Sequence, residues 1–541
     1  MEDRPPRRPN RPGNTHFVQV AGLVFTLGVA VAACIATNDS RGTQGTSGSA
    51  PGDSGAGGAA AGSAGGWTGG SSGAESEGGL CSFESCWSGC AVAALPGYSA
   101  LSANSFLPDP FMMISGTRMT SFSQWECRRE EIAAQLENYE LGAKYPKPAG
   151  TVTGSVSGTT MTVNVGGSSF TETITLPTTG TPPYPAMIAL DGGSLPASSI
   201  TGNGVALISF DTNAMGDQSG SDRGAGFFFQ VNGADSGAGA LVAWAWGVSR
   251  LIDALETTPA AMIDPKHLGV TGCSRDGKGA LMIGALDERI ALTIPQESGS
   301  GGDAGWRTSD VELAADGTDS VQTLGEIVGE NTWFSTALDV FAANHAATKL
   351  PYDHHAVLGL VAPRGLLDIE NTSYEWLGVM STTTDATAAR LIFQGLGVEE
   401  NMGFTNSSHT HCDFNPAETP YLDAFIAKFL LGQTSTSTAV WNVTSTAWQT
   451  SSSVVSTTNW VNWTVPTLKD LPDSGSASAP EGGAEGGESD ALDVEAGAPL
   501  DAAPEASEDA ANTATSDAGE PDAPIDSPPD VSASDDGSDG G

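Results

Sequence analysis

Short, continuous apolar runs recur along the middle of the chain, and each ends at a polar or glycine-containing stretch. Runs of this length without polar alternation are typical of strands that are buried on both faces of a parallel sheet. We therefore expect five strands, at residues 184–190, 204–210, 267–272, 290–296 and 365–371.

Helical patterns lie before, between and after these runs, at residues 130–142, 241–256, 277–287 and 421–432. Strands that alternate with helices predict an α/β fold, here a three-layer sandwich with a doubly wound, mostly parallel sheet and helices on both faces. In such sheets the functional site lies beyond the carboxyl ends of the strands. Residues 151–176 alternate between apolar and polar instead, which predicts an antiparallel hairpin before the main sheet.

The two ends of the chain have a different composition. Residues 35–80 are mostly Gly, Ser, Ala and Thr, and residues 471–541 contain 19 acidic residues but no Lys, Arg or aromatic residue. Such segments bury too little apolar surface to offset the entropy lost on ordering them. We expect a disordered linker at 35–80, a disordered acidic tail at 471–541 and one folded domain at 81–470.

The N-terminus has the features of an export signal. Basic residues precede an apolar run that ends in Val-Ala-Ala-Cys34, and this order favours a signal peptide over a membrane span. The ending resembles a bacterial lipobox, in which the cysteine is lipidated. We expect a lipoprotein-type signal over 1–34, lipidation at Cys34 and a place on the cell surface or outer membrane. The alternative is cleavage near Ala33 and secretion.

The net charge of the chain restricts the classes of molecule that it can bind. The net charge is −42, and the part of the chain outside the tail is acidic too, which opposes nucleic-acid binding. We expect a monomer that contacts a membrane only through its lipid.

An even number of further cysteines in an exported chain indicates disulfides, although spacing alone leaves fifteen pairings open. These cysteines are Cys81, Cys86, Cys90, Cys127, Cys273 and Cys412.

Ser274 is the candidate nucleophile. In "VTGCSRDGKGA" it lies where a strand passes into a helix, and a tight turn there lifts a hydroxyl into the cleft. The first N–H groups of the helix would stabilise an oxyanion. The second glycine, Gly277, stands one place later than in G-x-S-x-G, so a purely structural turn is the alternative.

Two basic residues follow the candidate nucleophile. Arg275 would place an N–H group and a permanent cation beside the reacting carbonyl. Lys278 lies four residues after Ser274 and so on the same helix face, where it could donate to substrate oxygens. The alternative is that both belong to an ordinary solvated helix face.

Glu297 is the candidate acid, because it ends an apolar run and precedes the glycine-rich stretch Ser-Gly-Ser-Gly-Gly. A carboxylate at the end of a strand is well placed to orient a histidine. Glu370 and Glu375 are the alternative acids, and a glutamate in a surface turn is the structural alternative for Glu297.

The candidate base lies in the late loop "SSHTHCDF", which contains His409 and His411. His411 adjoins Cys412 as Ser274 adjoins Cys273, so a Cys273–Cys412 bridge would hold nucleophile and base together. The alternatives are two unrelated thiols, or a zinc site built from His409, His411 and Cys412 that lacks a clear fourth ligand. We expect no metal and no cofactor. His354 and His355, in "PYDHH", fit a structural role better.

Several stretches between about Cys90 and Leu431 resemble the glucuronoyl esterases, carbohydrate esterase family 15, and the lipobox-like signal favours a bacterial member. They are "VTGCSRDGKGA", "PQESGSGG", "HTHCDF", "LPDPF", "WECRREEIAAQLENYELGAKYPKP", "VQTLGEIVGENTWF", "PYDHHAVLGLVAPRGLL" and "EWLG". The resemblance implies a serine-type α/β-hydrolase, catalytic over 81–470. It would cleave esters between 4-O-methyl-glucuronic acid on xylan and lignin alcohols, so its partner is the glucuronoxylan–lignin ester. An acetyl or short-acyl carbohydrate esterase and a catalytically dead surface carbohydrate-binding protein are the alternatives.

The resemblance also assigns roles to single residues. It implies Ser274 as nucleophile, His411 as base and Glu297 as acid, although some bacterial relatives place the acid on a later loop. Arg275 would support the oxyanion. The residues that would hold the sugar are Lys278, Gln322, Glu330 and Trp376.

Disulfides follow from the resemblance as well. It implies the bridges Cys273–Cys412 and Cys90–Cys127, which leaves Cys81 and Cys86 to pair with each other. Fungal members carry a further bridge, and the matching positions in this chain lie near Gly305 and Asp385, where both cysteines are missing.

Overall fold

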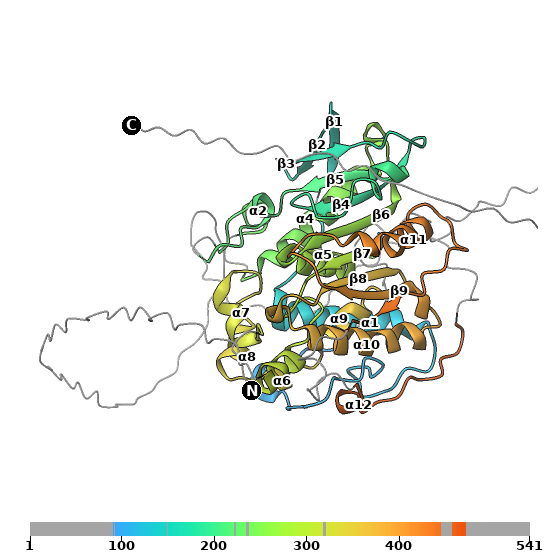
Figure 1. Cartoon of the computed structure of the whole chain (residues 1–541). Helices are drawn as coiled ribbons and strands as arrows, with labels where there is room; N and C mark the ends of the chain where they lie inside the picture. Colours follow the sequence, from blue (N-terminus) through green and yellow to red (C-terminus); the bar gives the residue numbers. More distant parts are fainter. Residues whose placement is uncertain are drawn as a thin grey trace, which may run out of the picture. The chain divides into compact units, whose positions relative to one another are not determined.

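The computed structural model describes residues 90, 92–148, 150–220, 223–233, 237–316, 321–444 and 457–471 (Figure 1). The expected signal peptide with Cys34, the linker, Cys81 and Cys86, and almost all of the acidic tail lie outside the described residues. In the part of the chain that is described, no helix is both long enough and apolar enough to cross a membrane.

A ten-stranded sheet forms the centre of the domain, with the order β1-β2-β3-β5-β4-β6-β7-β8-β9-β10. From β5 to β10 neighbouring strands are parallel, whereas β1, β2, β3 and β5 pair antiparallel. The strands are β1 Thr153–Ser157, β2 Thr160–Val165, β3 Ser168–Thr175, β4 Tyr184–Leu190, β5 Ala206–Phe210, β6 Ile263–Cys273, β7 Ile290–Gln296, β8 Gly365–Asn371, β9 Met402–Ser407 and β10 Trp441–Asn442.

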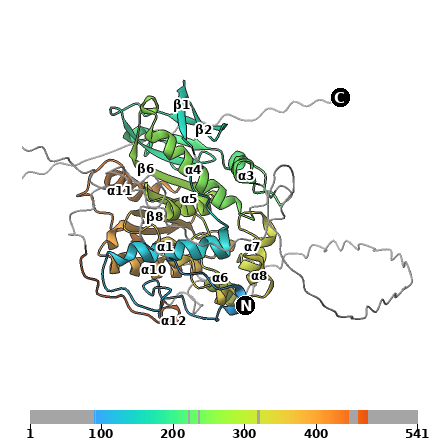
Figure 2. The same ribbon diagram turned by 180° about the vertical axis from the view of Figure 1, so that it is seen from behind.

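Helices cover both faces of the sheet, so the predicted three-layer α/β architecture is confirmed. Helix α11 packs on one face over an apolar cluster that includes Leu292 and Phe425. Helices α4, α5, α9 and α10 pack on the other face (Figures 1 and 2). The α-helices are α1 Gln124–Leu136, α2 Thr212–Met215, α3 Phe227–Asn232, α4 Ala240–Glu256, α5 Arg275–Leu286, α6 Trp306–Asp316, α7 Leu324–Glu330, α8 Asp339–Ala343, α9 His354–Gly359, α10 Val379–Gly395, α11 Thr419–Phe429 and α12 Thr457–Trp460.

Short helical turns complete the fold. A π-helical turn, η2 Glu137–Leu141, extends α1, so the helix expected at 130–142 begins earlier than its apolar pattern. The 3₁₀ turns are η1 Tyr98–Ala100, η3 Thr201–Asn203, η5 Pro259–Ala261, η6 Ala347–Lys349, η7 Glu375–Leu377, η8 Glu399–Asn401 and η9 Pro416–Glu418.

The five expected strands all form, and the antiparallel pairing predicted for 151–176 is confirmed, but its extent and its place relative to the main sheet differ from the prediction. This segment makes three antiparallel strands, and β3 pairs with β5, so the segment extends the main sheet instead of preceding it. Ile174 and Phe170 of β3 alternate inward and are buried, which gives the third strand a core face of its own.

Two buried elements, β9 and α10, could not be predicted from the pattern of apolar residues. Strand β9 is almost entirely buried, although its sequence Met-Gly-Phe-Thr-Asn-Ser is half polar. Helix α10 begins with Val-Met-Ser-Thr-Thr-Thr, a β-branched and polar run. Its threonine hydroxyls donate to backbone carbonyls one turn earlier, as from Thr383 to Val379 and from Thr384 to Met380. These bonds satisfy hydroxyl groups that would otherwise be buried without a partner.

Candidate active site

Ser274 stands at the carboxyl end of β6 and caps α5. Its backbone has φ 61° and ψ −125°, a conformation that is strained for a residue with a side chain. Glycines make the turn possible, since a Cβ atom on Gly272 would lie 2.3 Å from the carbonyl oxygen of Asp276. A Cβ atom on Gly277 would lie 2.4 Å from the carbonyl oxygen of Gln296. The second glycine therefore stands where the helix approaches β7, which accounts for the departure from G-x-S-x-G.

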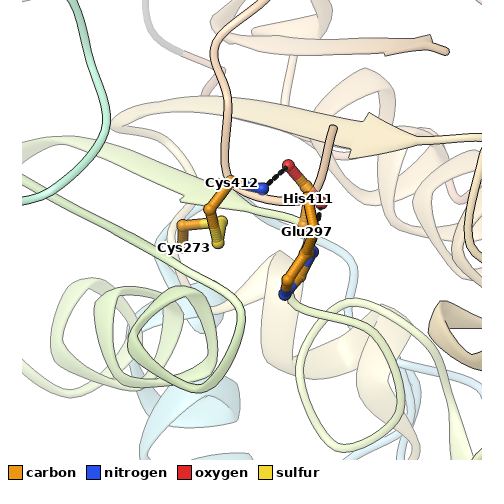
Figure 3. A group of neighbouring side chains, drawn as sticks. All are labelled: Cys273, Glu297, His411 and Cys412. Carbon is orange, nitrogen blue, oxygen red and sulfur yellow. Dashed lines mark hydrogen bonds and ion pairs between the residues drawn. A yellow bond between two sulfur atoms is a disulfide. The ribbon is translucent and has the colours of Figure 1, made fainter. Parts of the chain in front are cut away.

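A disulfide joins this turn to the late loop. Cys273 and Cys412 are bonded, with their Cα atoms 5.7 Å apart (Figure 3). Each cysteine is the direct neighbour of a candidate catalytic residue, Ser274 on one side and His411 on the other. A second disulfide joins Cys90 to Cys127. Both pairs are those that the family resemblance implies.

The acid and the base lie in direct contact. His411 Nδ1 lies 2.6 Å from Glu297 Oε2, and the Cys412 N–H donates to Glu297 Oε1 at 2.8 Å (Figure 3). Asn371, at the end of β8, also donates to Glu297 Oε2 at 3.1 Å. The Glu297 side chain is 2% exposed and its backbone has φ 48°. A buried carboxylate with these donors fixes the His411 ring and leaves Nε2 as the atom that can exchange a proton.

Two aromatic residues hold the His411 segment from the side. The Tyr374 hydroxyl accepts from the His411 backbone N–H at 3.0 Å. The Trp376 ring lies edge to face with the imidazole, with the ring centres 4.8 Å apart. Among the described residues no hydrogen bond joins Ser274 Oγ to His411. Bonds of this kind often tighten only when substrate binds, and in this structure the Cys273–Cys412 disulfide joins the two segments.

Arg275 opens helix α5, and its side chain is exposed. The first N–H groups of a helix have no partner within the helix, so they can stabilise negative charge near Ser274. Asp276 lies beside them and is buried. Burial, with a smaller contribution from Asp191, raises the pKa of its carboxyl to about 7, against the opposing charge of Arg275.

Of the four residues expected to hold the sugar, three are joined by hydrogen bonds, and Lys278 interacts with Glu330 through charge. Gln322 Nε2 donates to Glu330 Oε2 at 2.7 Å, and the Gln322 backbone N–H donates to the Trp376 carbonyl at 3.2 Å. Lys278 is 3% exposed, and its ammonium donates to the Ser298 carbonyl. Burial lowers the pKa of Lys278 to about 8, while nearby carboxylates, including Glu330, oppose that shift.

The residues that were alternatives to Glu297 and His411 have other surroundings. Glu370 is buried, and its Oε1 accepts from the Ser298 N–H at 2.8 Å instead of contacting His411. Glu375 is exposed on η7. His409 Nδ1 lies 3.7 Å from Glu297 Oε1, farther than His411. A zinc site at Cys412 is wrong, because the sulfur is in the disulfide.

His354 and His355 have structural surroundings. His354 is fully buried, with Nε2 3.2 Å from Glu140 Oε1. His355 Nε2 lies 2.9 Å from the Pro108 carbonyl. Sequence reasoning missed Asn371 and Tyr374, and the only signal for Asn371 is its place at the end of a buried strand.

Comparison with known proteins places the chain in a family. Residues 160–397 match the family described as "Glucuronyl esterase, fungi". The chain is 48% identical to the 4-O-methyl-glucuronoyl methylesterase of Schizophyllum commune, over 70% of this chain and 93% of that protein. The catalytic domain of the glucuronoyl esterase from Hypocrea jecorina superposes with a TM-score of 0.64 and 44% identity, covering 69% of this chain and all of that domain.

A further solved structure contains a ligand. It is a serine-to-alanine mutant of the Sporotrichum thermophile glucuronoyl esterase in complex with methyl 4-O-methyl-β-D-glucopyranuronate. Its TM-score is 0.64 at 42% identity, and the match covers 70% of this chain and 99% of that one. With this level of identity across almost the whole length of its relatives, the chain belongs to the glucuronoyl esterases of carbohydrate esterase family 15, which are carboxylic ester hydrolases with an α/β-hydrolase fold.

Proposed function

We propose that this chain hydrolyses esters of 4-O-methyl-glucuronic acid with Ser274, His411 and Glu297 as its catalytic residues. The contact of 2.6 Å between His411 and Glu297, joined to the Ser274 turn by the Cys273–Cys412 disulfide, carries the proposal. A serine becomes a useful nucleophile only when a base oriented in this way can take its proton.

The reaction follows from these positions. His411 Nε2 takes the proton of Ser274 Oγ as the oxygen attacks the ester carbonyl. The resulting oxyanion is stabilised by Arg275 and the N–H groups at the start of α5. The tetrahedral intermediate expels the alcohol, which receives the proton from His411. Water, activated in turn by His411, then hydrolyses the acyl-enzyme and restores Ser274.

The neighbouring residues would hold the acyl part of the substrate. Lys278, Gln322 and Glu330 offer an ammonium, an amide and a carboxylate to sugar hydroxyls, and Trp376 offers an apolar face to the ring. Fixing the sugar positions its carboxyl carbon against Ser274, which lowers the entropic part of the barrier. The carboxyl group of the scissile ester belongs to the sugar, so these contacts act on the acyl side.

In its natural setting we propose that the alcohol is a lignin alcohol and the acid is a side chain of xylan. The expected signal ending at Cys34 supports a bacterial, lipid-anchored enzyme on the cell surface or outer membrane, which acts as a monomer. Radiolabelled palmitate incorporation, compared between the chain and its Cys34→Ala variant, tests the anchor. Absence of label would leave a secreted enzyme.

The decisive substrate comparison uses a methyl ester of 4-O-methyl-glucuronate and an acetylated xylose at equal concentration. The proposal predicts rapid hydrolysis of the uronate ester and little release of acetate. Preference for the acetylated sugar would instead identify an acetyl esterase. No turnover of either ester, with no reaction towards a serine-directed phosphonate, would identify a carbohydrate-binding protein.

A further inference from the structure

Three buried carboxyl groups lie close together, one in the loop that follows β7 and two on β8. Asp303, Asp368 and Glu370 are each 0% exposed. One carboxylate oxygen from each lies within 4.8 Å of the others. We refer to these three residues as the buried carboxyl cluster. Three full negative charges in so small an apolar space would be strongly unfavourable, because they would lose hydration and repel one another.

These surroundings therefore favour the protonated form of the carboxyl groups. Burial, with repulsion from neighbouring carboxylates, raises the pKa values of Asp368 and Glu370 well above the ordinary range. Burial also raises the pKa of Asp303, and a hydrogen bond joins its carboxyl to that of Glu370. Asp303 Oδ2 and Glu370 Oε2 have no N–H or hydroxyl donor among the described residues. A proton shared between the two carboxyl groups supplies the missing donor.

The cluster holds the peptide that carries the acid Glu297. The Ser298 N–H donates to Glu370 Oε1 at 2.8 Å, and Ser298 Oγ donates to Asp303 Oδ1 at 2.6 Å. On the preceding residue, the Glu297 N–H donates to the Ile369 carbonyl at 2.8 Å. These bonds fix a backbone whose left-handed conformation at Glu297 is otherwise unfavourable. The cluster thus helps to determine where the carboxylate meets His411.

The same cluster faces the ammonium of Lys278. Lys278 donates to the carbonyl of Ser298, the residue that the cluster holds. Three carboxylates act on its charge: Asp303 from the loop after β7, Glu370 from β8 and Glu330 from α7. Burial removes hydration from the ammonium, and the remaining negative charge around it, that of the cluster and of Glu330, opposes the loss of its proton.

We propose that Asp303 and Glu370 are positioning residues for ester hydrolysis, which act through Ser298 on Glu297 and through their charge on Lys278. This inference rests on the proposed function, in which Lys278 binds the sugar. It predicts two separable contributions, one from hydrogen-bond geometry and one from charge.

The pH dependence follows from the sign of each charge. Lys278 loses its proton as pH rises through about 8, so the KM for a glucuronate ester should rise on the alkaline side. Removing negative charge from the cluster lowers the lysine pKa further, so the rise in KM should begin at lower pH. Of the groups that face Lys278, Glu330 stays unchanged in this comparison. Glu297 faces Glu370, and it is also unchanged.

The test uses the methyl ester of 4-O-methyl-glucuronate between pH 5.5 and 9 and compares three variants, Glu370→Gln, Glu370→Leu and Asp303→Asn/Glu370→Gln, with the unmodified chain. Glu370→Gln keeps an oxygen that can accept from the Ser298 N–H, and Asp303 still carries the negative charge that the pair shares, so kcat and KM should stay within about threefold of the unmodified chain. The double variant keeps both acceptor oxygens but removes that charge, so the alkaline rise in KM should shift down by about one pH unit, tenfold in proton concentration. Glu370→Leu removes the acceptor for the Ser298 N–H, so kcat should fall by about tenfold or more.

Asp385→Asn is the matched control. Asp385 is also fully buried with a raised pKa of about 8, but its carboxylate accepts from Thr308 Oγ1 and the His355 N–H, away from Lys278. Its KM profile should match that of the unmodified chain. If Glu370→Leu does not fold, the shift in KM of Asp303→Asn/Glu370→Gln still tests the role of the cluster.

The outcomes distinguish the inference from the function on which it rests. Normal hydrolysis by the unmodified chain, with a KM profile that Asp303→Asn/Glu370→Gln leaves unchanged, would overturn the positioning role and leave the esterase intact. An equal shift in Asp385→Asn would overturn it too, because the effect would then not be specific to the cluster. Failure of the unmodified chain to hydrolyse the ester would overturn both.

Discussion

Two contacts hold the loops around the active site, and they differ in chemistry. The Cys273–Cys412 disulfide joins the end of β6 covalently to the loop after β9. The loop after β7 meets α10 without a bridge, at Gly305 and Asp385. A Cβ atom on Gly305 would lie 2.5 Å from Asp385 Oδ1, so the two residues are in direct contact. The family resemblance implies that fungal members carry their further bridge near these two positions.

The two contacts respond to different conditions. The disulfide closes a sequence separation of 139 residues, and its contribution to stability does not depend on a titrating group. Asp385 holds its place by hydrogen bonds from Thr308 and the His355 backbone, and burial raises the pKa of its carboxyl to about 8. The disulfide thus lies beside the proposed catalytic residues, whereas the pH-sensitive contact lies between the loop after β7 and helix α10. This difference leads to predictions for each side.

Apart from loss of the nucleophile itself, the largest effect is expected on the bridged side, at the acid. Glu297→Gln keeps the shape of the side chain but removes the charge that stabilises protonated His411. We expect kcat to fall by about 10³–10⁴-fold, as is usual for the acid of a serine-hydrolase triad. Steady-state hydrolysis of a glucuronate ester measures the change, with Glu375→Gln, an exposed alternative acid, as the control. Equal activity in the two variants would remove Glu297 from the mechanism.

The next effect concerns the disulfide itself. The double variant Cys273→Ala/Cys412→Ala should lose about 2–5 kcal/mol of unfolding free energy, because the unfolded chain regains entropy. Its activity should fall as well, since the two segments that carry Ser274 and His411 are no longer joined by a covalent bond. Urea unfolding and ester hydrolysis measure the two losses. Cys90→Ala/Cys127→Ala is the control, which should lose stability without separating the two proposed catalytic residues. Full activity in the first double variant would show that the bridge does not position the site.

The smallest effect is expected at Asp385, and it depends on pH. A carboxyl whose folded pKa is raised binds more protons in the folded state, so stability falls as pH rises from about 4 towards 8. Asp385→Asn cannot ionise and should show a flatter profile, with a difference between the two chains that grows by about 1–3 kcal/mol over this range. Thermal unfolding between pH 4 and 8 provides the measurement. Parallel profiles would mean that Asp385 does not titrate in this range.

The sequence predicted the parallel core well, because fully buried strands leave continuous apolar runs such as 290–296 and 365–371. It failed at β9 and α10, whose polar residues are satisfied by contacts with distant segments and so break the pattern. It favoured Glu297 among three glutamates, but not by spacing: Glu370 ends a buried run just as Glu297 does. Only the fold shows that Glu370 faces Ser298 while Glu297 faces His411.

The buried carboxyl cluster could not be predicted at all. Asp303 lies in a glycine-rich loop, and Asp368 and Glu370 lie in a strand, so no local pattern connects them. Their proximity arises because β7 and β8 are neighbours in the sheet. A charged residue in an apolar run, such as Asp368, is the only trace that such a cluster leaves in the sequence.

The central claim is that Ser274 is the nucleophile, placed by the fold beside His411. The most direct measurement is hydrolysis of a benzyl ester of glucuronic acid by Ser274→Ala, with circular dichroism and thermal unfolding to establish that the fold is retained. We predict a folded protein whose kcat is reduced by about 10⁴-fold or more. A folded Ser274→Ala variant that still hydrolyses the ester at a rate near that of the unmodified chain would contradict the account.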